Sequence, residues 1–324
     1  MEITEKHISQ VSENLLFFLR EETGDSQIDY EKPPSQLQGG FDTSIFQFKL
    51  KNAQQSLLRP LVLRLFRKSH QPKQAIKESV IHNSLIDQGF LVPYVHYACI
   101  DDKYLGNQFL IMDFLTGALL PTVFEQDTAI VLGKIHAALH KADSKQLNED
   151  MIAEGFGGRQ YGIGGRLNRL VRASERLPWL EEIVFWLIEN RPSVCEHPSI
   201  CHGDFHPYNL LAKDGEVTGI LDWSSCSVGD PAADVASTLV IFNAATKHLI
   251  SSFDAKITTQ KYLNAYRGER DLNEQYLGYY QVLFSASRLF IGTKEAVIYT
   301  QLPIRNELIN IIYDLSKIHV EVPR

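Results

Sequence analysis

Two carboxylates and one amide near the middle of the chain are the residues whose types and spacing best suit chemistry on phosphate. Asn209 lies five residues after Asp204, and Asp222 closes the second of two apolar runs that follow. An Asp-Gly pair stands between these runs, which is typical of a β-hairpin turn. Such a hairpin would bring Asp222 back beside Asn209. Mg²⁺ prefers carboxylate and amide oxygens, so this segment predicts a metal–phosphate site.

Each of the three residues alone would more often be structural. Asp204 and Asn209 could cap a turn, and Asp222 could simply end a strand. Their combination at this spacing favours the site. Phosphoryl transfer needs positioning and charge neutralisation, so Asp204 suits a role in orienting an acceptor hydroxyl and taking its proton, with Mg²⁺ on the other two.

The composition is that of an ordinary globular protein. The chain has 324 residues, of which 44% are hydrophobic and 22% are charged. The net charge of −7, from 32 basic and 39 acidic residues, argues against a nucleic-acid partner. No apolar run approaches the roughly 18 residues of a membrane span, and the first residues lack the pattern of a signal peptide. Four cysteines without a C-x-x-C motif predict reduced thiols. We expect a cytoplasmic monomer or homodimer with no membrane partner.

The predicted secondary structure changes near residue 115, from mainly strands to mainly helices. Alternation and helical periodicity before that point predict one small lobe of antiparallel strands with a leading helix and one further helix. The strands are expected over 43–50, 61–66, 94–100 and 108–115, and the helices over 7–20 and 74–88. The Lys32–Ser35 segment, with two prolines, is typical of a turn.

From Phe124 onward helical periodicity dominates, apart from the segment that holds the site. A glycine-rich loop is expected over 155–165. Helices are expected over 130–140, 166–176, 179–190, 232–245, 251–266, 273–292 and 305–318.

Three motifs between Ile200 and Ala236 resemble those of the aminoglycoside phosphotransferase/choline kinase-like superfamily. They are H-G-D-F-H-P-Y-N, I-L-D-W and G-D-P-A-A-D. The resemblance implies an α+β, two-lobed, protein-kinase-like fold, with a small antiparallel sheet in a nucleotide-binding lobe over 1–115 and a mainly helical lobe over 116–324. It implies an ATP-dependent kinase acting on a hydroxyl of a small molecule. Asp204 would be the catalytic residue, and Asn209 and Asp222 the Mg²⁺ ligands.

Three further residues of these motifs have structural interpretations. His206 could contact the acceptor or the phosphates, but bonding to local backbone is the favoured role. Asp230 suits an N-cap before Pro231. Asp234, on the helix that follows, could bond the backbone of the catalytic loop.

The nucleotide side offers a turn and an ion pair. Backbone N–H groups between Gly39, Gly40 and Ser44 could cradle phosphates, although a bare hairpin turn would look the same. Arg64, amid apolar residues, suits the α- and β-phosphates, with Glu78 on the following helix as its partner; the alternative is a surface arginine on an edge strand. Protein kinases have a lysine at the equivalent place, and because an arginine keeps the charge but changes the reach, the preference between ATP and GTP stays open.

Base and acceptor contacts are expected from other segments. The strand-to-link segment, whose backbone would meet the base, comprises Met112, Asp113, Phe114 and Leu115. Acceptor contacts are expected from His206, Tyr279, Tyr280 and Arg288. A run of arginines includes Arg166 and Arg169 and is either a solvated helix face or part of a cleft for an anionic or neutral acceptor.

Two other functions stay open from the sequence. One is a nucleotide-binding pseudokinase without turnover. The other is a protein kinase, which is disfavoured because the chain lacks the G-x-G-x-x-G loop, the D-F-G and the A-P-E segments.

Overall fold

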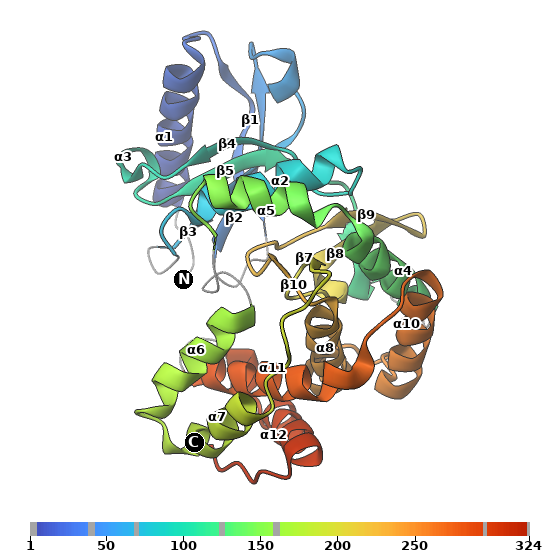
Figure 1. Cartoon of the computed structure of the whole chain (residues 1–324). Coiled ribbons are helices and arrows are strands. Elements are labelled where there is room, and N and C mark those ends of the chain that lie inside the picture. Colours follow the sequence, from blue (N-terminus) through green and yellow to red (C-terminus); the bar gives the residue numbers. More distant parts are fainter. Residues whose placement is uncertain are drawn as a thin grey trace. The chain divides into compact units, whose positions relative to one another are not determined.

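The computed structural model (Figure 1) describes residues 5–37, 43–67, 71–122, 127–157, 163–293 and 297–322. The chain divides into two compact units. Unit 1 comprises residues 1–117 and 218–224, and unit 2 comprises residues 118–217 and 225–324. An antiparallel sheet dominates the first part of the chain and helices the second, which confirms the predicted α+β class.

Unit 1 is built on a five-stranded antiparallel sheet with the order β1-β2-β3-β5-β4. Its strands are β1 (Asp29–Gln36), β2 (Thr43–Lys51), β3 (Leu61–Phe66), β4 (Val95–Cys99) and β5 (Phe109–Asp113). Its helices are α1 (Glu5–Thr23), α2 (Gln74–Asp87) and the short α3 (Asp102–Leu105).

The central strand β3 explains how the sheet separates two cores. Successive side chains of a strand point to opposite faces. Leu61, Leu63 and Leu65 join the core that includes α1 residues, whereas Val62 and Phe66 join a second core with Ala75 of α2. Arg64 has the parity of the second set, so the alternation directs its side chain to the α2 face. The edge-strand interpretation of Arg64 was wrong, because β2 and β5 flank β3.

The Lys32–Ser35 segment forms part of β1 and not the turn that its prolines predicted. β1 lies at the edge of the sheet, and its pairing with β2 shifts register between Lys32 and Ser35. Proline has no N–H to donate to a ladder and is tolerated in strands at edges and irregularities. The position of the strand therefore accommodates both prolines.

Unit 2 is mainly helical. Its helices are α4 (Thr128–Lys141), α5 (Ser144–Ala153), α6 (Ile163–Ser174), α7 (Glu181–Glu189), α8 (Pro231–Ile241), α9 (Lys247–Leu249), α10 (Ala255–Glu269), α11 (Leu277–Gly292) and α12 (Leu302–Ser316). α4 packs against α10, and α11 packs against both α8 and α12. Every residue of α8 from Ala232 to Ile241 is buried, so this helix forms the centre of the unit.

Short strands frame the segment that carries the predicted site. β7 (Ser199–Cys201) pairs with β10 (Ser227–Gly229), and β6 (Ala118–Leu119), β8 (Leu210–Lys213) and β9 (Glu216–Ile220) form a three-stranded sheet. Asp214 and Gly215, between β8 and β9, both have positive φ, at 53° and 83°. Two positive φ values favour an Asp-Gly turn, as the sequence predicted.

Two segments of unit 2 differ from expectation. α5 was not predicted, and α6 begins at Ile163, inside the expected glycine-rich loop. Residues 158–162 of that loop lie outside the described residues. None of the helices in the described part of the chain is both long enough and apolar enough to cross a membrane.

Candidate active site

The loop after β7 begins with a glycine that no other residue could replace without strain. Gly203 has a φ of +81°. A Cβ at this position would lie 2.5 Å from the carbonyl oxygen of Ser225. The strand pair β7–β10 brings these two backbone segments together, so the close approach fixes where the loop leaves the strand.

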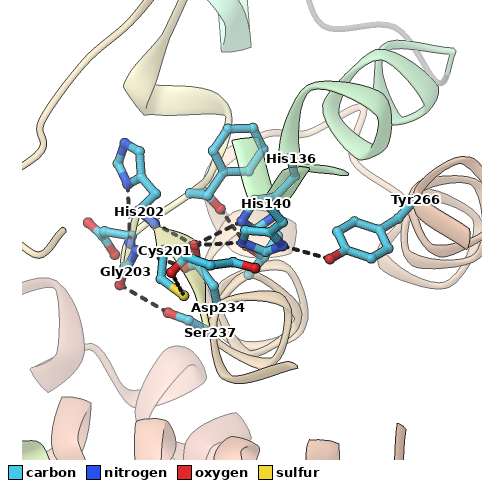
Figure 2. A network of polar contacts seen from close by, with 12 residues as sticks. His136, His140, Cys201, His202, Gly203, Asp234, Ser237 and Tyr266 are labelled. Carbon is cyan, nitrogen blue, oxygen red and sulfur yellow. Dashed lines mark hydrogen bonds and ion pairs between the residues drawn. The ribbon is translucent and has the colours of Figure 1, made fainter. Parts of the chain in front are cut away.

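Asp234 of α8 holds the start of this loop through its carboxylate (Figure 2). The backbone N–H groups of His202 and Gly203 donate to it, the latter over 2.8 Å. His136 Nε2 lies 3.0 Å and His140 Nε2 3.2 Å from Asp234 Oδ2. One buried carboxylate therefore meets four donors, and the predicted bond from Asp234 to the loop backbone is confirmed.

The two histidines are themselves held by tyrosines. His136 Nδ1 lies 2.7 Å from the hydroxyl of Tyr262, and His140 Nδ1 lies 2.6 Å from that of Tyr266. His136, His140 and Asp234 are residues of metal-ligating type whose ligand atoms lie within 4.8 Å of one another. Each ring nitrogen has a protein partner, so the geometry is that of a hydrogen-bonded network.

Burial and the contacts among its members together set the charges of this network. Burial and the neighbouring His136 lower the pKa of His140 to about 4, so its ring is neutral near pH 7. Burial alone would raise the pKa of Asp234, but His136 and His140 outweigh it and hold that pKa well below its usual range. Asp234 thus keeps its negative charge where it accepts the loop N–H groups.

α8 also binds the carbonyl groups of the loop. Ser237 Oγ donates to the Gly203 carbonyl over 3.2 Å, and Thr238 Oγ1 donates to the Phe205 carbonyl over 2.9 Å. Sequence reasoning missed both residues, since a hydroxyl on a buried helix gives no local signal of its distant partner.

Asp204 presents a half-buried carboxylate between two cationic or protonable groups. Its Oδ1 lies 3.4 Å from Arg288 Nη2, and its Oδ2 lies 3.4 Å from His206 Nε2. Asn209 Nδ2 donates to the Asp204 carbonyl over 2.9 Å, which ties the two residues together. Burial favours the neutral carboxyl, but His206 and Arg288 outweigh it and lower the pKa of Asp204. The carboxylate is therefore ionised at neutral pH.

His206 caps the 3-10 helix η5 (Pro207–Asn209). The backbone N–H of Tyr208 donates to His206 Nδ1 over 3.2 Å. Since Nδ1 accepts, a neutral ring carries its proton on Nε2, which faces Asp204. The expected bond to local backbone is confirmed, and the ring orients the neighbouring carboxylate as well.

The acceptor residues expected on α11 separate into two groups. Arg288 reaches Asp204. Tyr280 instead donates to Asp230 over 2.9 Å, and Tyr279 stacks on Trp186 with ring centroids 6.2 Å apart. Asp230 caps α8 as predicted, by accepting from the N–H of Ala232.

Unit 1 contains the second group of predicted residues. Arg64 Nη1 lies 2.6 Å from Glu78 Oε2, which confirms the predicted pair, and Arg64 Nη2 lies 3.3 Å from Asp222 Oδ1. Gln74 donates to the other oxygen of Glu78 over 2.8 Å. Burial raises the pKa of Glu78 against the opposing influence of Arg64, and the negative charge of Asp222 adds to the rise.

Asp222 lies past the end of β9 in an unusual backbone conformation, with a φ of 59°. Asp tolerates this left-handed region better than most residues. Lys77, buried on α2, donates to the carbonyl of Ser224 two residues further on. No local pattern could predict this contact of Lys77, because its partner is 147 residues away.

The remaining nucleotide-side residues are placed less completely. Gly39 and Gly40 lie outside the described residues, and Ser44 lies in β2 opposite Leu65. Met112 is buried in β5. The backbone N–H groups of Asp113 and Phe114 donate to the carbonyls of Tyr94 and Pro60.

These bonds limit which backbone groups of the segment 112–115 could contact a nucleotide base. Two of its four N–H groups, those of Asp113 and Phe114, already donate to carbonyls, so the expected backbone contact would have to use the other two N–H groups or the carbonyls. The Asp113 carboxylate lies 2.8 Å from His96 and 3.0 Å from Arg59. Both contacts hold the Asp113 side chain at the end of β5, and the one to Arg59 is an ion pair.

Comparison with known proteins identifies the family. The model of the phosphotransferase enzyme family matches residues 34–271. The chain belongs to this family. A curated relative, acyl-CoA dehydrogenase family member 11 from Pongo abelii, is 26% identical in an alignment of 216 residues, which covers 63% of this chain and 26% of that protein. This chain thus spans about a quarter of the length of that relative.

Solved structures share the fold. A thermostable mutant of aminoglycoside phosphotransferase APH(4)-Ia, in a ternary complex with ADP and hygromycin B, superposes with a TM-score of 0.61 at 17% identity over 92% of this chain and 98% of that chain. A macrolide 2'-phosphotransferase from Brachybacterium faecium gives a TM-score of 0.55 at 21% identity over 95% and 100%. At these identities the likeness shows the phosphotransferase fold.

Proposed function

We propose that the protein is an ATP- and Mg²⁺-dependent kinase that transfers the γ-phosphoryl group to a hydroxyl of a small molecule. The observation that carries the proposal is the ionised, half-buried Asp204 on a loop whose backbone is fixed by α8. Membership of the phosphotransferase family supports the same reaction. The complex of a neighbour of the same fold with ADP supports a nucleotide as donor.

Asp204 accepts the hydrogen of the acceptor hydroxyl in this proposal. The hydroxyl oxygen attacks the γ-phosphorus, the bond to the β,γ-bridging oxygen breaks, and the proton passes to the carboxylate. His206 and Arg288 hold the two oxygens of that carboxylate and keep it ionised before the transfer. The low pKa of Asp204 suits orientation of the hydroxyl with late proton transfer.

The donor set fits Mg²⁺ by its chemistry. The amide nitrogen of Asn209 is committed to the Asp204 carbonyl, which directs its oxygen elsewhere, and Asp222 offers a carboxylate with 42% of its side chain exposed. Asn209 and Asp222 would hold the ion, and their expected approach stays a prediction. Bound Mg²⁺ neutralises phosphate charge. Arg64, held by Glu78, would add a permanent positive charge for the α- and β-phosphates, and the backbone of Gly39, Gly40 and Ser44 would contact them.

A radiolabel transfer assay tests the proposal. Mg²⁺ and γ-labelled ATP are incubated with hydroxyl metabolites and antibiotics, with peptides as the protein-kinase control. We expect transfer to a small molecule, and a loss of about 10²- to 10⁴-fold in kcat for Asp204→Asn with binding of Mg·ATP retained. Asp214→Asn removes an exposed carboxylate from the turn after β8 and should leave kcat unchanged.

Two results would contradict the proposal. Transfer by Asp204→Asn at the rate of the unaltered protein would remove Asp204 from the mechanism. A rise in melting temperature with Mg·ATP, without label transfer to any compound, would indicate a nucleotide-binding pseudokinase.

A further inference from the structure

Arg288 is buried, and its ion pair with Asp204 does not use all of its N–H groups. The residue is 6% exposed, and its Nη2 donates to Ser237 Oγ over 3.0 Å as well as facing Asp204. Within the described residues, its Nε and Nη1 are buried without a hydrogen-bond partner. Buried guanidinium N–H groups are normally satisfied, because each unpaired one costs about 1–3 kcal/mol. Part of this donor fork is therefore available to a bound group.

A second guanidinium lies on the same aromatic ring. The Cζ atom of Arg166 is 4.8 Å from the centroid of the Phe284 ring, and that of Arg288 is 5.5 Å from it. Arg166 comes from α6 and Arg288 from α11, two helices in contact. Two cations from different helices thus contact the ring of Phe284, and one of them, Arg288, pairs with Asp204.

The local charges do not balance. Asp204 is the carboxylate paired with Arg288, and Asp234 is already surrounded by four donors. Burial, followed by the positive charges of Arg288 and Arg169, lowers the pKa of Arg166 to about 10, so it remains a cation at neutral pH. Among the residues that the structure describes, two guanidiniums beside the single carboxylate of Asp204 leave an excess of positive charge.

We propose that Arg166 and Arg288 form an anion subsite, and that the acceptor carries a carboxylate or phosphate group close to the hydroxyl that is phosphorylated. The subsite itself rests on the arginines, and the identity of its ligand as the acceptor rests on the proposed function. A planar guanidinium fork matches carboxylate and phosphate oxygens. The same excess charge would repel polycationic acceptors such as aminoglycosides.

A charge series on one carbon skeleton tests the subsite. The probes are glycerol, glycerate, glycerol 3-phosphate and 3-amino-1,2-propanediol, which present a neutral, a carboxylate, a phosphate and an ammonium group beside hydroxyls. Binding to the full chain is measured by saturation-transfer NMR, without nucleotide and with Mg·ADP. We expect glycerate or glycerol 3-phosphate to bind at least about tenfold more tightly than the neutral and cationic probes, with and without Mg·ADP.

Matched variants of α6 locate the effect. Arg166→Gln should weaken anion binding about tenfold or more, and Arg166→Lys should recover part of it. Arg172→Gln removes an exposed arginine from another side of α6 and should leave binding unchanged. If Arg166→Gln does not fold, as judged by circular dichroism, the charge series on the unaltered protein still decides.

Three outcomes would overturn the inference. Anionic probes that bind no better than glycerol would exclude the subsite, and equal losses in Arg166→Gln and Arg172→Gln would assign the effect to general charge. Anion binding abolished by Mg·ADP would assign the arginines to the nucleotide phosphates. None of these outcomes depends on turnover, so failure of phosphoryl transfer alone would contradict only the proposed kinase.

Discussion

Each unit contains a cluster of charged and hydrogen-bonded groups around one shared residue, but the shared residue is a cation in unit 1 and a carboxylate in unit 2. In unit 1 one cation, Arg64, is shared by two carboxylates, Glu78 and Asp222. In unit 2 one carboxylate, Asp234, is shared by two imidazoles and two backbone N–H groups. The pKa of Glu78 is raised, whereas that of Asp234 is lowered.

The difference shows that burial alone does not decide the charge of a carboxyl group. Both groups are buried, and in both burial favours the neutral form. Asp234 keeps its charge because it meets an excess of donors, while Glu78 competes with Asp222 for one guanidinium. We infer that unit 1 tolerates additional positive charge, which suits a metal ion, and that the Asp234 network serves to fix backbone.

The largest expected effect comes from removing the shared cation. Arg64→Ala leaves Glu78 buried without its counter-charge, and breaking such a pair typically costs about 3–5 kcal/mol. We expect the free energy of unfolding, measured in urea, to fall by about 3 kcal/mol because protonation of Glu78 relieves part of the cost. In the proposed function KM for ATP should rise as well.

Lys49→Ala is the matched control in the same sheet. Lys49 pairs with Glu31, but both side chains are exposed to solvent, at 32% and 46%. Exposed pairs contribute roughly 0–1 kcal/mol. Equal costs for the two variants would show that burial does not distinguish the Arg64 pair.

Gly203→Ala should have the next largest effect. The substitution combines a left-handed backbone, which costs about 1–2 kcal/mol outside glycine, with contact against the Ser225 carbonyl. Gly215→Ala has a similar φ of 83°, but no atom lies within 4 Å of the added Cβ. We expect Gly203→Ala to lower the free energy of unfolding by more than Gly215→Ala, and equal losses would remove the close approach as a cause.

The pH dependence of stability tests the network around Asp234. His140 has a pKa of about 4 in the folded protein against 6.5 ordinarily, so the unfolded chain takes up its proton first as pH falls. Its contribution to stability is present above pH 6.5 and is lost by about 1.4 kcal/mol per pH unit between pH 6.5 and 4.

His140→Gln removes this titration, so its urea-derived free energy of unfolding should depend less steeply on pH in that window. Tyr266→Phe removes a partner of the ring but keeps the titrating group, and should retain the steeper dependence. An unchanged slope in His140→Gln would contradict the neutral, buried histidine.

Single hydroxyls in the network should contribute least. Thr238→Val removes one of the bonds from α8 to the loop and should cost about 1 kcal/mol in urea unfolding. Thr258 is equally buried, and its hydroxyl has no hydrogen-bond partner among the residues that the structure describes. Thr258→Val should therefore be neutral or stabilising, and an equal loss in both variants would contradict the assigned bond.

Local patterns predicted most of the elements and one ion pair. β3 has the predicted bounds, and the alternation that places Arg64 among leucines also turns it toward Glu78. α5 was missed because only Leu147 and Met151 of its residues are buried, which leaves little periodic signal. The structure shows that Asp143 caps the N-terminus of α5 by accepting from the N–H of Lys145.

The long-range contacts of the site could not be predicted. Arg288 is 84 residues from Asp204, and His136 is 98 residues from Asp234. Sequence periodicity predicted helices for Arg288 and His136, but it could not predict which helix packs against which. Helix packing decides such pairings, and packing depends on the whole apolar surface.

The return of residues 218–224 to unit 1 has a consequence for biosynthesis. Asp222, which pairs with Arg64, leaves the ribosome 158 residues later than its partner. Chains fold from the N-terminus as they emerge, so the nascent sheet can form the contacts Arg64–Asp222 and Lys77–Ser224 only after residues 222 and 224 have been synthesised. A fragment cut at residue 117 would lack both partners, Asp222 and Ser224.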